Sequence, residues 1–197
     1  MQRGFKAWCE KQALQWRKEL DLSVHACLPA RKLADHLEID VIRPQDIPDI
    51  TQKDIERLIH LDPTSWSAAT VSTVGCTIII FNPRHSTVRQ EADIMHELAH
   101  IIRGHKPIGF NYIQGFPFPL RQYRKEDEEE AQWLGGCLQI PRDGLKWVLD
   151  RGMTEDEIVI HFVASSEMVR YRRNKTGIDI QRLHSQRNSL RFRKANK

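Results

Sequence analysis

The sequence predicts an α+β fold in which a small mixed or antiparallel sheet lies beside several helices. Two β-prone runs, residues 68–72 and 77–81, are joined through Gly75. Helical patterns follow around His96-Glu97-Leu98-Ala99-His100 and over residues 126–140. A C-terminal pair of short helices, similar to a helix-turn-helix, completes the predicted fold.

The first part of the chain alternates between helix and connection. Residues 5–20 predict a helix with one apolar face and basic residues on the other, and residues 28–37, with Pro29 near the start, predict a second helix. Residues 38–42 are typical of a short strand. A short helix is expected over residues 54–60, capped by Thr51.

The two β-prone runs should form an antiparallel pair. Residues 78–81 are almost entirely apolar and should be central, whereas the Thr- and Ser-rich run should lie nearer the edge. An exposed edge beside the following helix would let a peptide substrate add as a strand. The alternative is that the pair forms only a small supporting sheet.

The helix that follows carries the H-E-x-x-H pattern. Ser86 or Thr87 should cap its start, and Gly104 should end it. His96 and His100 are four residues apart and so project from one face, where two neutral imidazoles can hold one Zn²⁺. Glu97 is the predicted catalytic base for a water molecule that the metal activates. His85 is expected at the surface.

A catalytic zinc site needs a third protein ligand. The metzincin pattern is excluded, because Arg103 and Lys106 occupy its Gly and His positions, and His105 is one place off. In residues 126–141, Glu128 lies three before Ala131, on the apolar face of the predicted helix. Glu128 is therefore the predicted ligand, and Glu130 stays the alternative. His₂Glu ligation leaves the fourth position open for water.

These paired motifs resemble the ImmA/IrrE zinc metallopeptidases over roughly residues 28–178. The family pattern H-E-[LF]-[AG]-H is matched at residues 96–100. Its second pattern, E-x-x-A-[ND]-x-F-A-x-x-L-L-x-P, corresponds to residues 128–141, with departures at Gln132, Leu134 and Gly135. The resemblance implies an endopeptidase with one Zn²⁺ per chain and Glu128 as third ligand. It also implies a protein substrate, often a helix-turn-helix transcriptional repressor cut in regulatory proteolysis of a mobile element or stress response.

The connection between the two motif helices is rich in glycine, proline and aromatic residues. Residues 108–120 are therefore expected to be a loop that passes near the site. Its aromatic side chains could line a substrate pocket or cover the core. Tyr112 and Tyr123 are candidates to stabilise the oxyanion of the tetrahedral intermediate.

Beyond Pro141, residues 143–150 predict a helix, and Thr154 with Glu157 forms a capping box for the helix pair at 154–173. From residue 170 to residue 197 the chain has ten Lys or Arg and one acid, in a protein of net charge +4. Such asymmetry is typical of a nucleic-acid or acidic partner. The alternative function is thus a DNA-binding or adaptor protein that uses residues 154–197, with a structural or vestigial metal site.

These patterns suggest four segments: an N-terminal helical extension (1–27), a zinc peptidase domain (28–150), a helix pair packed on it (151–180) and a basic, flexible tail (181–197). No apolar run could span a membrane and no signal peptide is expected. The four cysteines lack C-x-x-C spacing and indicate free, mostly buried thiols in a reducing cytoplasm.

Overall fold

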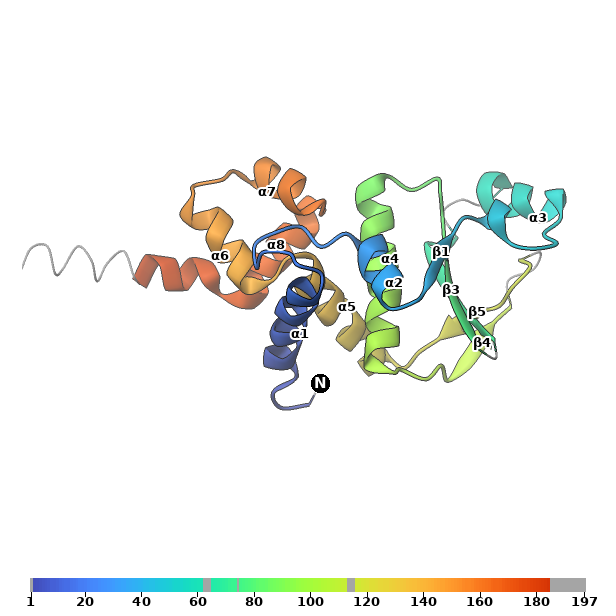
Figure 1. Ribbon diagram of the computed structural model, residues 1–197, viewed down its shortest axis with the longest axis horizontal. Helices are drawn as coiled ribbons and strands as arrows, with labels where there is room; N and C mark the ends of the chain where they lie inside the picture. The colour runs from blue at the N-terminus through green and yellow to red at the C-terminus, as the bar shows by residue number, and fades with distance from the viewer. Residues whose placement is uncertain (1, 62–64, 74, 113–115, 185–197) are drawn as a thin grey trace, which may run out of the picture.

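The α+β class is confirmed. A computed structural model describes residues 2–61, 65–73, 75–112 and 116–184. In Figure 1 the sheet lies at one end of the molecule, α4 and α2 lie beside it, and α6–α8 form the opposite end. The elements in chain order are α1 (Phe5–Glu19), α2 (Ala30–His36), β1 (Asp40–Ile42), η1 (Pro44–Asp46), α3 (Gln52–Glu56), η2 (Arg57–Leu61), β2 (Ala68–Thr73), β3 (Cys76–Phe81), α4 (Thr87–Arg103), β4 (Gly109–Asn111), β5 (Leu120–Gln122), α5 (Lys125–Gln139), α6 (Arg142–Asp150), α7 (Glu155–Phe162) and α8 (Ser166–Thr176).

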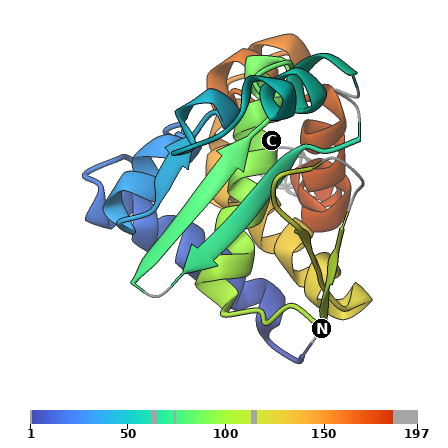
Figure 2. The same cartoon turned by 90° about the vertical axis from the view of Figure 1, so that its right-hand side faces the viewer.

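The larger sheet has the order β1-β3-β2, so β3 is central and β2 is an edge strand, as expected. β1 runs parallel to β3 and β2 runs antiparallel to it, with Thr70 opposite Ile79. Alternate side chains of β3 enter different cores: Ile79 and Phe81 pack with the helices, and Ile80 packs on the opposite face. Figure 2 views this sheet face-on, with α4 behind it.

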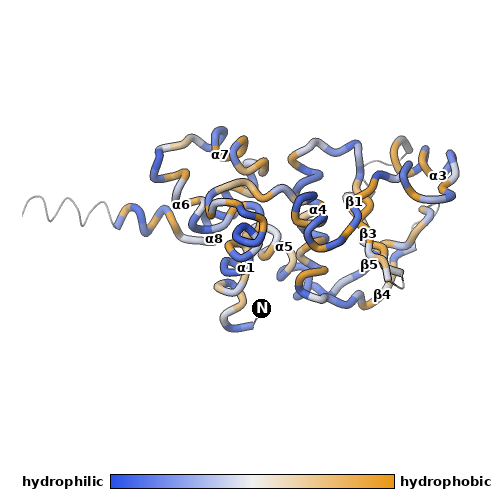
Figure 3. Tube along the Cα trace, in the orientation of Figure 1, coloured by the Kyte–Doolittle hydropathy of each residue, from blue (hydrophilic) through white to orange (hydrophobic). Residues whose placement is uncertain are grey.

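The face of the sheet away from α4 has its own apolar cover. Leu58, Trp66 and Ile80 form a buried cluster there, and Phe116 and Phe118 pack against it. Aromatic side chains of the 108–120 connection therefore contribute to a core. Figure 3 shows how apolar stretches run through the sheet and through α4.

The expectation of a plain loop over residues 108–120 is wrong at both ends. β4 and β5 form a two-stranded antiparallel sheet in which Phe110 lies opposite Arg121, and the Ile108 amide donates to the Gln122 carbonyl at 2.8 Å. The high glycine and proline content concealed two strands of three residues each. Pairing across the connection, which no local pattern reveals, stabilises them.

Helix α4 begins and ends where expected. The Ser86 hydroxyl accepts a hydrogen bond from the Arg89 amide, and Gly104 ends the helix with a φ of 66°, a left-handed conformation that glycine adopts without strain. Met95, Leu98 and Ala99 are buried on one side of α4. α5 packs against α4 there, and a Cβ on Gly135 would be in ordinary van der Waals contact with the Met95 carbonyl oxygen, at 3.5 Å.

Helix α1 packs against α5 within the main core through Phe5, Cys9 and Ala13. The prediction that its basic residues all lie on the opposite face is wrong for Arg17, which is fully buried. Its guanidinium donates to the carbonyl oxygens of Leu138 at 2.9 Å and of Gln139 at 3.2 Å. Burial lowers the pKa of Arg17 to about 10. The last turn of α5 leaves carbonyls without helical partners, and Arg17 satisfies them.

Helices α6, α7 and α8 enclose a separate apolar cluster that includes Leu145, Ile158 and Val169. The predicted capping box of Thr154 and Glu157 is present. Arg172 of α8 is fully buried; its guanidinium donates to the Ile140 carbonyl oxygen at 2.8 Å and pairs with Glu10 of α1. The expected basic tail falls largely on residues 185–197, outside the described residues.

All four cysteines are free, but only Cys9 and Cys137 are buried, and Cys76 is exposed. None of the described helices combines the length and apolar composition needed to cross a bilayer.

Replacing Arg17 by Met should lower the free energy of unfolding by about 3 kcal/mol, because buried carbonyls would lose charge-assisted hydrogen bonds. Urea unfolding followed by circular dichroism measures the change. The exposed neighbour Lys18 is the matched control, and Lys18→Met should change stability by less than about 0.5 kcal/mol. Equal effects of the two substitutions would contradict this role of Arg17.

Candidate metal centre

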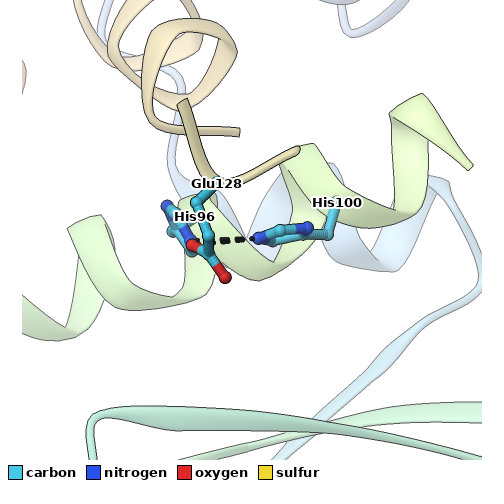
Figure 4. Close-up of side chains that lie close together, drawn as sticks. All are labelled: His96, His100 and Glu128. Carbon is cyan, nitrogen blue, oxygen red and sulfur yellow. Dashed lines mark hydrogen bonds and ion pairs between the residues drawn. The ribbon is translucent and has the colours of Figure 1, made fainter. Parts of the chain in front are cut away.

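The structure brings His96, His100 and Glu128 together. The two histidines lie one turn apart on α4, and Glu128 comes from the first turn of α5. His96 Nε2 lies 3.0 Å from a Glu128 oxygen and 3.1 Å from His100 Nε2, and His100 Nε2 lies 3.6 Å from the same oxygen. Figure 4 shows Glu128 reaching from α5 toward both rings. Among the described residues, this is the one group of three such side chains that could hold a metal ion.

The spacing of these donor atoms fits a tetrahedral ion. With bonds of about 2.0–2.1 Å, such an ion separates its donors by about 3.3 Å. The three observed separations, 3.0, 3.1 and 3.6 Å, bracket that value. Two imidazole nitrogens and one carboxylate form a donor set that zinc accepts readily.

The electrostatics of the cluster favour two of the three donors in their metal-binding form. Burial lowers the pKa of His100 to about 4, so its ring is neutral at pH 7. The hydrogen bond with His96 holds the pKa of Glu128 below its ordinary value, so Glu128 is ionised. Burial alone would lower the pKa of His96, but the bond to Glu128 and the charge of Glu97 raise it.

Glu97 points toward the edge strand of the sheet, where the buried Thr70 of β2 donates its hydroxyl hydrogen to the carboxylate. Burial raises the pKa of Glu97, and the bond from Thr70 opposes that rise in part. A carboxylate held in this way, next to His96 and with its pKa raised by burial, is a candidate to accept and return a proton.

A cavity of about 120 Å³ lies over the cluster, between β2 and β5. Tyr123 forms part of its wall and stacks on the His100 ring, with 3.8 Å between ring centroids. Tyr112 is 77% exposed and does not line this cavity. The cavity is lined by Ala68, Ala69, Thr70, His96, Glu97, His100, Leu120, Arg121, Tyr123 and Glu128.

Glu130, the alternative ligand, lies outside the cluster of three. Its carboxylate accepts hydrogen bonds from the Arg103 guanidinium at 2.6 and 3.0 Å. His105 is not among the three donors either, but it lies directly behind one of them, with its Nδ1 3.1 Å from His100 Nδ1.

The expectation that His85 lies at the surface is wrong. Its side chain is only 7% exposed, and its Nδ1 lies 2.7 Å from the carboxylate of Asp93, one turn before His96 on α4. A turn sequence such as Asn82-Pro83-Arg84-His85 does not reveal that the following helix supplies an acidic partner.

Sequence reasoning missed Thr70 and Arg121. Arg121 lines the cavity and donates to Ser72 Oγ on β2 at 2.7 Å, and its other terminal nitrogen lies 3.4 Å from the Tyr123 hydroxyl oxygen. Thr70 was visible only as one of several hydroxyl residues in an edge strand. Thr70, rather than another hydroxyl residue of β2, lies next to Glu97 because β2 pairs with β3 and both strands pack on α4.

Two helices that present a His₂Glu donor set and an adjacent carboxylate define a metallopeptidase type of centre. A family model for the IrrE N-terminal-like domain of the M78 peptidases matches residues 52–174. The chain therefore belongs to this metallopeptidase family, which confirms the resemblance to ImmA/IrrE proteins. Comparisons with curated proteins and with solved structures gave no match.

If Glu128 is the third ligand, Glu128→Ala should lose bound zinc, while Glu130→Ala should keep about one zinc per chain, as the wild type should. The measurement is elemental analysis of purified protein after zinc loading and removal of free metal. Loss of zinc only in the Glu130 variant would identify Glu130, and not Glu128, as the third ligand.

Proposed function

We propose that the protein is a zinc-dependent endopeptidase in which His96, His100 and Glu128 hold the metal and Glu97 is the catalytic base. The supporting observation is that Glu97 lies beside a three-donor cluster and faces the same cavity as its donors. Zinc, when bound, supplies a Lewis acid that polarises a carbonyl and lets water act as a nucleophile at neutral pH.

The protein's own groups carry the proton transfers. Glu97 accepts a proton from the attacking water, so that the oxygen can form a bond to the scissile carbonyl carbon. The carboxylic acid so formed then gives its proton to the leaving amine as the C–N bond breaks. Thr70 keeps the carboxylate pointing into the cavity throughout.

The wall of the cavity opposite Glu97 offers groups for the substrate. Tyr123 and Arg121 both line it from the β5 side, so a hydroxyl and a guanidinium are available near the place where negative charge develops on oxygen. Ala68, Ala69 and Thr70 belong to the edge strand β2 and line the other side. We infer that an extended substrate segment lies along β2 and pairs with the edge that faces away from β3, with which no described strand pairs.

The substrate in this proposal is a protein, and the resemblance to ImmA/IrrE proteins favours a helix-turn-helix transcriptional repressor. Cleavage of such a repressor would relieve repression. Family membership supports the class of substrate, and the small cavity between two strands supports an extended segment of chain rather than a folded surface.

The charges of the described C-terminal helices favour the peptidase over the DNA-binding alternative. A phosphate-binding surface needs cations that are free to neutralise phosphates. Four arginines of this region instead pair with acids of the same chain: Arg170 with Glu155, Arg172 with Glu10, Arg173 with Asp179 and Arg182 with Asp150. These helices are therefore better explained as a packed part of the fold.

Replacing Glu97 by Gln should reduce cleavage by at least about 100-fold and leave zinc bound, because the amide cannot accept the proton. The assay incubates the zinc-loaded protein with an extract of the organism that encodes it, and labels newly formed N-termini for mass spectrometry. New N-termini should appear with the wild type, with repressor proteins among their sources. Equal sets of N-termini with wild type and Glu97→Gln would contradict the proposed base.

Thr70→Val should lower kcat about 10-fold with little change in KM or zinc content, because it removes the hydroxyl that holds Glu97 but keeps the side-chain shape. Thr70→Ser is the matched control and should retain most of the activity. Both are measured on a peptide that spans a cleavage site found by the N-terminal labelling. Full activity in Thr70→Val, or a loss in Thr70→Ser as large as that in Thr70→Val, would contradict a specific role of the hydroxyl.

A further inference from the structure

His105 is a buried histidine that the proposed mechanism does not use. It follows the Gly104 cap of α4, and its side chain is only 6% exposed. Its Nδ1 lies 3.1 Å from His100 Nδ1, and its Nε2 lies 3.6 Å from a Glu130 oxygen and 3.8 Å from an Asp127 oxygen. One ring thus connects a proposed metal ligand with two carboxylates of α5.

The proposed role of His100 determines which ring nitrogen donates and which accepts between His100 and His105. Its Nε2 faces His96 and Glu128, so a lone pair at Nε2 must be available to the metal. The ring hydrogen then resides on Nδ1 and is donated to His105 Nδ1. The hydrogen of His105 resides on Nε2, on the side of the two carboxylates. This arrangement pairs the two Nδ1 atoms and sets the tautomer of each ring, while the buried His105 Nε2 faces the two carboxylates at 3.6 and 3.8 Å, beyond direct hydrogen-bond distance.

Glu130, one of the two carboxylates near His105, is itself held in place. Arg103 donates two hydrogen bonds to Glu130, and its guanidinium lies 5.0 Å from the ring centroids of Phe5 and Trp8 of α1. Helix α1 lies outside the matched residues 52–174. The contacts therefore extend from His100 to an N-terminal helix beyond the matched region.

We propose that His105 is a positioning residue that orients His100 for metal binding, with Asp127 and Glu130 orienting His105 in turn. The proposal rests on the metal centre proposed above and adds the side chains that hold one of its ligands. Groups that hydrogen-bond to a metal-binding histidine restrict its ring and raise the basicity of the donor nitrogen, and their loss typically costs about 10- to 100-fold in metal affinity.

The test compares zinc affinity in His105→Phe and His105→Asn with that of the wild type, by competition with a chromogenic chelator. Phe keeps a ring but cannot accept from His100, so zinc binding should weaken about 10- to 100-fold. Asn retains an acceptor near the position of Nδ1 and should recover most of the affinity. The absorption spectrum of the cobalt-loaded protein should change in the Phe variant, since it reports ligand geometry.

Two further variants separate positioning from a loss of stability. His161→Phe makes the same replacement at a half-buried histidine that stacks on Trp147 in the α6–α8 region, and zinc affinity should stay within about twofold of the wild type. Glu130→Gln removes charge next to His105 with little change in volume and should weaken zinc binding by a smaller factor than His105→Phe. The thermal unfolding of each metal-free variant shows how much of its effect reflects stability.

Wild-type zinc affinity in both His105→Phe and Glu130→Gln would overturn this proposal and leave the proposed function intact. Equal weakening in His105→Phe and His161→Phe would also overturn it. Absence of zinc binding by the wild type itself would instead overturn the proposed function, and the positioning role with it.

Discussion

The close crossing of α4 and α5 is the contact on which the metal centre depends. A Cβ added to Gly135 would meet the Met95 carbonyl oxygen at 3.5 Å and His96 Cα at 3.7 Å. Glu128 precedes Gly135 by seven positions, about two helical turns, and so lies on the same face of α5. The face of α5 that contacts α4 at Gly135 therefore also presents Glu128 to the two histidines.

The far end of α5 is held by buried charges rather than by apolar packing alone. Arg17 and Arg172 come from opposite ends of the chain, and both donate to carbonyl oxygens where α5 ends, over residues 138–140. Glu10 pairs with Arg172 and accepts the amide hydrogen of Arg142 at the start of α6. Side chains of α1 and α8 both bind this end of α5. These contacts oppose rotation of α5 about its axis, and such a rotation would move Glu128.

Periodic patterns were sufficient to predict the α+β class, the antiparallel pair of β2 and β3, and the ends of α4. Each of these depends on residues close together in the sequence, such as Ser86 and Gly104 around α4. The apolar-face argument for Glu128 was less successful, because its side chain is 47% exposed and Glu130 is the buried acid of this turn. The hairpin of β4 and β5 did not follow, because its strands gain stability only by pairing across a glycine- and proline-rich connection.

The burial of charged side chains was equally beyond local patterns. Arg17 follows the basic pattern of an exposed helix face, but its guanidinium finds buried acceptors at the carbonyl oxygen of Ala26 and at the carbonyl end of α5, 121 positions away. The roles of the polar residues His85, His105 and Thr70 were hidden for the same reason, since each depends on a partner on another segment. A pattern can identify groups that act as neighbours on one helix, such as His96 and His100, but not the hydrogen bonds that hold them.

The arrangement divides the site between a helical side and a strand side. α4 and α5 provide the three candidate donors, β2 provides Thr70, β5 provides Arg121, and Tyr123 follows directly after β5. One side-chain hydrogen bond, from Thr70 to Glu97, connects the two sides, and a second, from Arg121 to Ser72, connects β5 with β2 within the strand side. A metal centre that served only to stabilise the fold would need a fourth protein ligand in place of this cavity. The described residues place a cavity and a held carboxylate there, which is the arrangement that hydrolysis requires.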